Sequence, residues 1–403
     1  MTFARLPALP RLLIATQFAF NIGFFAVLPY LSAHLTGSLA LAGWLAGLIL
    51  GLRTFSQQGL FVIGGALTDR FGPRPVVLAG CALRVAGFAW LGFAESTWAV
   101  VAAVLLIGFA AALFSPAVES EIVRQAAAHE RATGVARAQV LGLFNAAGQA
   151  GALIGPVLGT ALLGLGFRAA CLAGAAVFVL VLLGQLALMP SGSTAARRDG
   201  ARGVVDIARN RRFLGLCGAY GSYLLLYNQL YLALPAQVER ATGTQGALGW
   251  LFALSSALVV AGQLPLSGWA ARRLSLRRSL LIGLGLMAAG AVAAGLLLPV
   301  RAAGGLLPSL AFVVLLTAGQ MLVVPAARAW LPDLAEDHRL GLYTGAMFSL
   351  SGLLVLAGGA PLGALFDAEG PLPWFALAAV ALAGALCVPK PPRGAGGPTR
   401  AAP

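Results

Sequence analysis

The sequence predicts an all-α membrane protein with twelve transmembrane helices in two six-helix pseudo-repeats. Of its 403 residues, 59% are hydrophobic and only 10% are charged, and the mean hydropathy is +0.88. Soluble domains are about half apolar and a quarter charged. Apolar stretches of about twenty residues recur along the whole chain, each long enough to cross a hydrocarbon core of about 30 Å as a helix. Barrel strands would instead alternate in polarity over about ten residues, so these stretches favour a helical bundle.

We expect each apolar stretch to form one span. The first is too long for a cleavable signal and has no convincing small-residue cleavage site, so it should remain attached. The twelve predicted spans are residues 11–33, 42–63, 76–94, 98–118, 140–161, 169–189, 213–234, 247–267, 280–299, 306–327, 341–363 and 373–389.

The basic residues indicate how these spans are oriented. With a cytoplasmic N-terminus, only Arg168, Arg240 and Arg301 fall in loops on the opposite side, and most of the other Lys and Arg residues fall in cytoplasmic segments. This is the positive-inside bias of inner-membrane proteins, and it predicts that both termini are cytoplasmic. The net charge of +14 therefore reflects membrane topology, and we do not expect a nucleic-acid partner.

Residues 190–212 form a polar, arginine-rich stretch that we interpret as a cytoplasmic linker. It separates an N-terminal six-helix bundle (1–189) from a C-terminal one (213–389), and residues 390–403 have the composition of a disordered tail. The halves carry matching segments at similar positions: GALTDRFGPR and GWAARRLSLR, SPAVES and VPAARA, GPVLG and APLG. Duplicated halves with parallel topology are typical of transporters whose substrate site lies between them near the membrane midplane. Chance matching in a Gly-rich chain is the alternative.

Other functional classes find little support in the sequence. Its four cysteines and three histidines show no metal-ligand spacing, and no nucleotide-binding loop or nucleophile triad is present. We therefore expect no cofactor, no metal and no enzymatic activity. The expected partners are a small-molecule substrate, protons as the coupling ion and the lipid bilayer, and we expect a monomer.

The apolar pattern breaks between the second and third spans, at GGALTDRFGPRP (64–75). This segment resembles the loop signature of the major facilitator superfamily, Gly-x-Leu-Ala-Asp-Arg-x-Gly-Arg-Arg. The surrounding sequence is similar to that of its twelve-span drug:proton antiporters, in particular the bacterial MdtH-type exporters, over essentially the whole chain. The matching loop positions are Gly65, Asp69, Arg70, Gly72 and Arg74.

The resemblance implies that this loop is a conformational latch. Asp69 would meet the positive N-terminal end of the eleventh helix, while Arg70 and Arg74 would pair with Glu119 and Glu121 at the end of the fourth span. Such contacts form in one conformation and break in another. The alternative is a solvated loop with ordinary cytoplasmic arginines.

The fifth span contains a second family motif. GALIGPVLG (151–159) resembles the Gly-x-x-x-Gly-Pro-x-x-Gly antiporter motif, through Gly151, Gly155, Pro156 and Gly159. Glycines four residues apart let another helix approach closely, and the proline permits a kink. A generic small-residue packing face is the alternative reading.

The chain departs from the antiporter pattern in its charges. The Arg that antiporters of this type carry in the fourth span is missing, and none of the thirteen acids lies deep in a span. Glu119 and Glu121 are therefore the candidate coupling acids. The embedded charges are Arg53 and Arg84, which must face protein or water because each costs at least about 3 kcal/mol at the bilayer centre. One interpretation is that they brace neighbouring helices by hydrogen bonds to carbonyls or to amides such as Gln57. The alternatives are a role in conformational coupling and attraction of an anionic group on the substrate.

The resemblance implies that spans one, four, seven and ten line the substrate cavity. Span seven carries four of the six tyrosines on one helix face, either lining the cavity or packing against other helices. Spans one and ten add neutral hydrogen-bonding groups. The candidate cavity residues are Gln17, Asn21, Tyr220, Tyr223, Tyr227, Tyr231 and Gln320.

These features predict a secondary transporter of the bacterial inner membrane. We expect it to export hydrophobic or amphipathic small molecules, as multidrug efflux proteins do, by alternating access coupled to proton entry. The alternatives are an importer or uncoupled facilitator for a small metabolite, and a non-transporting membrane receptor with the same fold.

Overall fold

The computed structural model describes residues 6–134, 137–190, 209–300, 302–334, 340–368 and 370–390. The first group of helices is α1 (Ala8–Phe25), α2 (Leu28–Ala33), the π-helix η2 (His34–Ser38), α3 (Gly43–Gln58), α4 (Phe61–Phe71), α5 (Pro73–Gly92), α6 (Thr97–Thr133), α7 (Arg137–Leu163) and α8 (Phe167–Leu188). The second group is α10 (Arg211–Asn228), α11 (Ala233–Thr242), α12 (Leu248–Arg273), α13 (Leu276–Leu297), the 3-10 helix η4 (Ala302–Gly305), α14 (Leu307–Leu334), α15 (Leu340–Asp367) and α16 (Leu372–Cys387).

The helices confirm the predicted all-α membrane fold. Ten helical stretches of the described chain are long and apolar enough to cross a membrane, with α1, α2 and η2 counting as one stretch and most of α4 joining α3. The shorter apolar helix α16 and the helix α10, which begins with two arginines, occupy the places of the two remaining predicted spans.

Two predicted spans are interrupted by proline. Span one breaks after Phe25 and span seven breaks after Asn228. Pro29, and Pro235 directly after the predicted end of span seven, lack an N–H group, and their rings clash with the carbonyl four residues earlier, which favours a break or kink in the helix. Each break redirects the chain near the end of its span.

Several helices run further than the sequence predicts. α4 continues through Phe71, so Gly65 and Asp69 lie in a helix rather than in the expected loop, and the turn is left to Gly72, whose φ of 84° suits glycine. α6 and α14 extend beyond the predicted ends of spans four and ten. Hydropathy marks only where a helix leaves the lipid, whereas a helix in water continues until a residue breaks it, as Gly134 does after α6.

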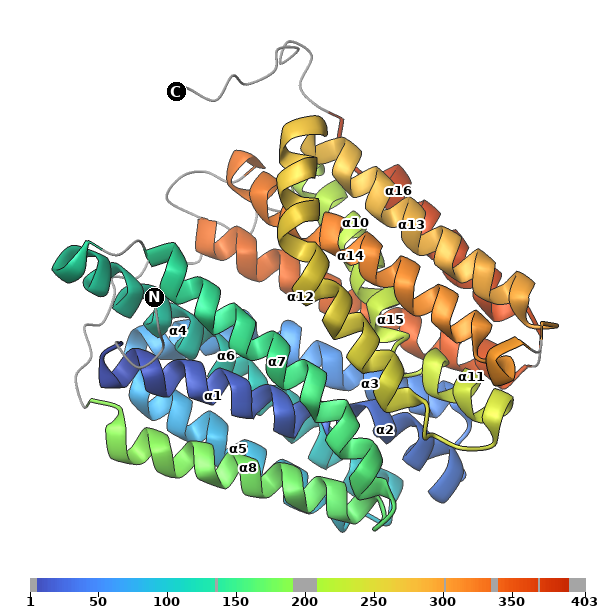
Figure 1. Ribbon diagram of the computed structural model, residues 1–403, viewed down its shortest axis with the longest axis horizontal. Coiled ribbons are helices and arrows are strands. Elements are labelled where there is room, and N and C mark those ends of the chain that lie inside the picture. The colour runs from blue at the N-terminus through green and yellow to red at the C-terminus, as the bar shows by residue number, and fades with distance from the viewer. Residues whose placement is uncertain are drawn as a thin grey trace.

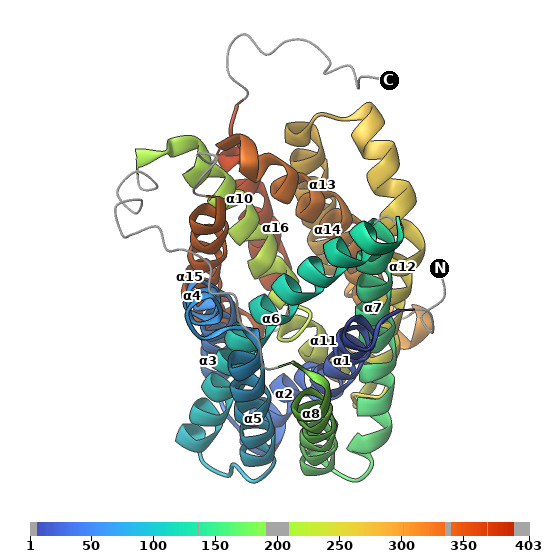
Figure 2. The ribbon, with the colours of Figure 1, turned by 90° about the vertical axis from the view of Figure 1, so that its left-hand side faces the viewer.

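The helices form two bundles, α1–α8 and α10–α16 (Figure 1). We call the end of the molecule where α1 begins and α16 ends the terminal end, and the opposite end the far end. α3 packs along α15 on one side of the molecule, and α7 packs against α12 on the other (Figure 2). These two helix pairs provide the main contacts between the bundles.

Small residues allow α3 and α15 to touch at the far end. A Cβ atom on Gly43 would lie 2.6 Å from the carbonyl oxygen of Gly363, and one on Gly47 would overlap Gly359. The Asp367 carboxylate at the end of α15 accepts hydrogen bonds from the backbone N–H of Gly43, with both oxygens 2.9 Å from the nitrogen. The first turn of α3 is therefore capped by the opposite bundle.

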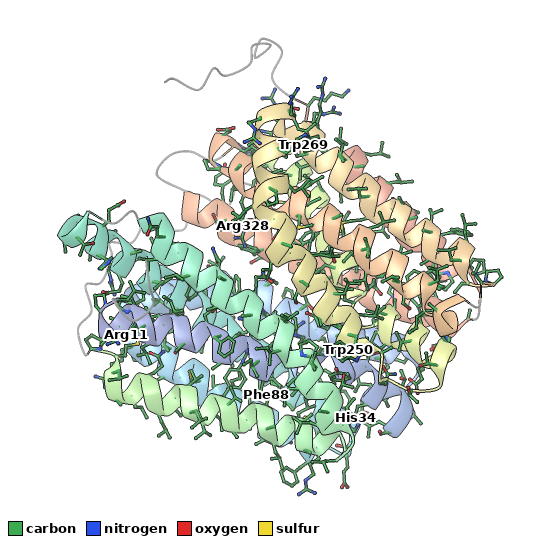
Figure 3. The ribbon with its side chains drawn as sticks, in the orientation of Figure 1. Arg11, His34, Phe88, Trp250, Trp269 and Arg328 are labelled. Atoms are coloured by element: carbon green, nitrogen blue, oxygen red, sulfur yellow. The ribbon has the colours of Figure 1, made fainter. Side chains whose placement is uncertain are left out.

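Exposed tryptophans mark both ends of α12. Trp250 lies at its far end and Trp269 near its terminal end (Figure 3), with 69% and 46% of their surfaces exposed. At 1.5 Å per residue they are about 28 Å apart along the helix. This spacing matches a hydrocarbon core with an aromatic residue at each interface.

Candidate substrate cavity between the two bundles

A cavity of about 170 Å³ lies between the two bundles. Both bundles contribute to its wall, through α1 and α7 on one side and α10, α12 and α14 on the other. The lining residues are Gln17, Asn21, Phe25, Asn145, Gly148, Gln149, Ala152, Tyr227, Leu230, Phe252, Ser255, Ser256, Val259 and Gln320.

The wall of the cavity is polar but uncharged. Five side-chain amides, three hydroxyl groups and two phenylalanines stand among its lining residues, and none of these residues carries a charge. Side-chain amides both donate and accept hydrogen bonds, so the same wall can hold donor and acceptor groups of a ligand. Aromatic and aliphatic residues between them supply apolar contact surface.

The structure brings together part of the predicted cavity set. Gln17, Asn21, Tyr227 and Gln320 line the cavity, whereas the other three tyrosines do not. The sequence analysis missed α7 and α12 as walls, although Asn145 and Gln149 stand one helical turn apart in span five and Ser255 and Ser256 interrupt span eight. Those polar pairs within apolar spans could have identified α7 and α12 as cavity walls.

The tyrosines of α10 and the following turn form a column of neighbouring rings that meet at tilted or edge-on angles. The ring centroids of Tyr220 and Tyr223 are 5.2 Å apart, those of Tyr223 and Tyr227 6.0 Å, and those of Tyr227 and Tyr231 6.1 Å. Tyr231 also lies 5.5 Å from the ring of the cavity residue Phe252. The column is buried except where Tyr227 reaches the cavity.

Arg53 and Arg84 are buried, with 5% and 1% of their surfaces exposed. Arg53 donates to the Gln57 side chain at 2.8 Å, and Arg84 donates to the backbone oxygen of Ile107 at 3.3 Å. Both guanidinium groups face the ring of Phe24, at 4.8 and 5.4 Å from its centroid. Hydrogen bonds and cation–π contacts therefore stabilise them, in keeping with a bracing role for both.

Two oppositely charged residues face each other across the bundles at the terminal end. Glu119 on α6 and Arg328 on α14 (Figure 3) are close enough to interact electrostatically, and Arg328 is within hydrogen-bonding reach of the Tyr220 hydroxyl. Both charged side chains are exposed, so water reaches this side of the contact. They occupy matching places in the internal repeat, each three residues after a proline within its helix, Pro116 or Pro325.

The second candidate coupling acid is already paired. Glu121 is buried, forms an ion pair with Arg124 and accepts a hydrogen bond from Gln125 at 2.8 Å. In this conformation neither Glu119 nor Glu121 pairs with an arginine of the loop motif. Glu121 is bound by residues of its own helix, and Glu119 faces Arg328 on α14.

The residues of the loop motif lie around the end of α4. Arg74 donates to the backbone oxygen of Leu186 at 3.1 Å, and the Arg70 guanidinium lies 5.1 Å from the ring of Phe71. A Cβ atom on Gly65 would meet open space. The Asp69 side chain lies outside the described part of the structure, so its contact with the eleventh span remains a prediction.

The glycines of the antiporter motif pack α7 against α1. A Cβ atom on Gly151 would overlap the carbonyl oxygen of Phe18, and one on Gly155 would lie 2.8 Å from the Cβ atom of Phe25. The Tyr30 hydroxyl donates to the backbone oxygen of Pro156. The motif thus positions the α7 wall of the cavity within the N-terminal bundle.

This packing predicts a difference between two glycines of one helix. Gly151→Ala should lower the apparent melting temperature in detergent by several degrees, because overpacking costs about 1–3 kcal/mol. Gly142→Ala should leave it unchanged or raise it, since a Cβ atom on Gly142 meets nothing within 4 Å and alanine favours a helix. Equal melting temperatures for the two variants would contradict the packing.

Comparisons with known proteins agree with this architecture. The family model described as Major Facilitator Superfamily matches residues 12–240 and 213–403. An uncharacterised MFS-type transporter of Mycobacterium tuberculosis (strain ATCC 25618 / H37Rv) is 36% identical over 366 residues, covering 89% of this chain and 86% of its own. The multidrug resistance protein MdtH of Yersinia pestis (strain Pestoides F) is 32% identical over 370 residues, covering 90% and 88%.

Solved structures show the same fold at low sequence identity. A peptide transporter POT in complex with sulfate has a TM-score of 0.78 and 19% identity, covering 95% of this chain and 94% of its own. A POT family transporter in complex with 5-aminolevulinic acid has a TM-score of 0.79 and 14% identity, covering 96% and 98%. The family match, the relatives and the two-bundle fold lead to one conclusion: the chain belongs to the major facilitator superfamily and is a membrane transporter, not an enzyme.

Proposed function

We propose that this protein exports hydrophobic or amphipathic small molecules across the bacterial inner membrane by alternating access. The observation that carries the proposal is the cavity between the bundles, whose wall combines amides, hydroxyls and aromatic rings from both halves. A site shared by two bundles can be opened to either side when they rock about it. A wall that is polar, uncharged and aromatic suits molecules of varied structure.

We place the terminal end in the cytoplasm, which the distribution of arginines supports. In that orientation the structure is closed toward the outside, where Asp367 joins α15 to α3 and Gly249 of α12 packs against Thr160 of α7. The exposed charges of Glu119 and Arg328 lie on the cytoplasmic side. The conformation is therefore the one in which an exporter receives its substrate.

The similarity to MdtH supports multidrug efflux as the physiological role, because that relative is named a multidrug resistance protein. The Gly-x-x-x-Gly-Pro motif, which resembles that of exporters, points the same way. Antibiotic resistance in cells that express the protein is the corresponding phenotype.

We further propose that proton entry drives export and that Glu119 is the group that titrates. In the cytoplasm-closed conformation Glu119 and Arg328 would pair directly, and a proton arriving from outside would neutralise Glu119 and release the pair. The bundles would then open inward, the proton would leave to the cytoplasm and substrate would enter. Glu121 is a poorer candidate because Arg124 already stabilises its charge.

Transport into everted vesicles tests this proposal. Labelled aromatic amphiphiles should accumulate in vesicles that contain the protein when a proton gradient is applied. Gln149→Ala should raise the half-saturating concentration about fivefold, because it removes a hydrogen-bonding group worth about 1 kcal/mol. Gln139→Ala, an exposed glutamine of the same helix outside the cavity, should have no effect.

Three other outcomes would contradict the proposal. Protein-dependent movement in the opposite direction would identify an importer, and flux without any proton movement would identify a facilitator or another driving ion. Absence of flux for every amphiphile would favour a receptor.

A further inference from the structure

We propose that the cavity prefers amphipathic molecules that carry a negative charge, and that the buried guanidinium of Arg53 provides the attraction. The inference rests on the proposed function, since it names the substrate class of the same cavity. It depends on three observations: uncompensated buried positive charge, its position behind the cavity wall, and the donor groups of the lining.

The first observation is a pair of neighbouring buried cations without an acidic partner. Arg53 and Arg84 lie close enough to influence each other electrostatically, and within the described ranges neither forms an ion pair with a carboxylate. Nε of Arg53 and both Nε and Nη1 of Arg84 are buried without a hydrogen-bond partner. Arginine effectively does not deprotonate, so both sites are charged.

Two acidic residues of α6, by contrast, have a basic residue nearby. Glu121 is bound to Arg124, and Glu119 faces Arg328. The described part of the membrane interior therefore has an excess of positive charge, which Arg53 and Arg84 supply.

The second observation places Arg53 directly behind the cavity wall. Its guanidinium carbon lies 5.6 Å from the centroid of Tyr231, and it also interacts electrostatically with Tyr227, which lines the cavity. Tyr231 in turn contacts the ring of the cavity residue Phe252 at a tilted angle. Aromatic rings therefore connect the charge to the cavity lining, and a charge buried in protein is poorly screened.

The third observation is the supply of hydrogen-bond donors without acidic groups. The amides of Asn145 and Gln149 on α7 and the hydroxyls of Ser255 and Ser256 on α12 can all donate to a carboxylate. Among the described residues that line the cavity, none carries a carboxylate that would attract an ammonium group. A unit charge about 10 Å from Arg53, at an effective dielectric constant of about 20, would bind on the order of tenfold more tightly as an anion than its neutral analogue.

A purely bracing role for Arg53 makes a different prediction. The hydrogen bond to Gln57 and the ring of Phe24 hold the side chain in place. If holding the helices together were its whole effect, removal of Arg53 would change stability and affect ligands of every charge alike. The dependence of binding on ligand charge separates the two roles.

The test uses three probes with the same ring system. They are 2-naphthyloxyacetate, which is an anion, its neutral amide 2-naphthyloxyacetamide, and the cation 2-(2-naphthyloxy)ethylammonium. Dissociation constants are measured by calorimetry on the full-length protein in a neutral detergent. We expect the anion to bind about tenfold more tightly than the amide, and the cation to bind most weakly.

Variants of Arg53 identify the source of the preference. Arg53→Gln should bring the anion and the amide to similar affinities while the affinity for the amide stays near its original value, which also shows that the cavity is intact. Arg53→Lys keeps the charge and should keep most of the preference. If Arg53→Gln does not fold, the order of the three affinities on the unmodified protein and on Arg53→Lys still tests whether the cavity prefers the anion.

Different results would contradict the charge preference and the assignment of the cavity as the binding site. Equal affinities, a preference for the cation, or no binding of any probe would overturn the charge preference. The cavity itself is tested with Gln149→Ala, which should weaken all three probes; binding that this substitution does not change would place the probes outside the cavity and overturn both claims. Unequal affinities that persist in Arg53→Gln would refute the role of Arg53.

Discussion

Reversing the charge in Glu119→Arg should lower transport at least tenfold, and adding Arg328→Glu should restore much of the activity. The two residues face each other from equivalent places in the two bundles. Two unit charges about 4 Å apart at an effective dielectric constant of about 20 interact by about 4 kcal/mol. Even a third of this interaction energy, left after screening by water, changes the equilibrium between the cytoplasm-closed and cytoplasm-open conformations by a factor of about ten. Repulsion would hinder closure of the cytoplasmic side, whereas the double exchange rebuilds an attractive pair.

The same vesicles separate gating from proton coupling. Glu119→Gln keeps the size of the side chain but cannot titrate, so the signal of a pH-sensitive dye on substrate addition should disappear. The double variant should recover closure, since it again places a carboxylate opposite a guanidinium. Arg131→Glu changes the charge of α6 by a similar amount near its cytoplasmic end and serves as the control. Loss of transport in the double variant equal to that in Glu119→Arg would contradict the pairing.

The sequence predicted the family and the order of the spans because both depend on local composition. An apolar stretch of twenty residues must be helical in lipid wherever it lies in the chain. The interruptions at Pro29 and Pro235 are also local chemistry, and they were missed because hydropathy does not register a proline. Helix ends in water, such as Thr133 of α6, depend on the next helix-breaking residue rather than on the lipid.

The site was harder to predict because it is made by contacts between distant segments. The matching segments SPAVES and VPAARA placed Glu119 and Arg328 in equivalent positions, but their opposite charges acquire meaning only when the bundles face each other. The resemblance supplied other partners for Glu119, because the predicted span ten ends at residue 327 whereas α14 continues through Arg328 to Leu334. Likewise, Gln149 stands on a helix whose glycines suggested only packing.

The Asp367 carboxylate joins α15 to α3 at the closed far end, and its removal should loosen that end. Asp367 accepts from the N–H of Gly43, and no side chain of α3 itself caps this helix. Loss of a helix N-cap costs about 0.5–2 kcal/mol, so Asp367→Ala should shift the ratio of closed to open molecules roughly two- to thirtyfold. Asp367→Asn, which keeps an acceptor but loses the charge, should have a smaller effect.

Hydrogen–deuterium exchange measured by mass spectrometry checks this at the helices concerned. In Asp367→Ala, uptake should rise in the first turns of α3 and in the last turns of α15, because both ends lose their partner. Glu95→Gln removes a charge from the loop before α6, at the same end of the molecule, and should leave uptake in these segments unchanged.

The result also bears on the mechanism. The expected contact of Asp69 on α4 with the start of α15 would join the continuation of α3 to the same partner helix at the terminal end. An acidic side chain would then meet a helix N-terminus at each end of the interface that α3 and α4 form with α15. Rocking of the bundles requires the Asp69 contact to form while the Asp367 contact breaks, and the reverse. If Asp367→Ala raised uptake at the cytoplasmic ends of α4 and α15 instead, the far end would not be the one held shut by this residue. The substitution could instead raise uptake at the far end and lower it at the cytoplasmic ends of α4 and α15. The Asp367 and Asp69 contacts would then be coupled through the packing of α3 on α15.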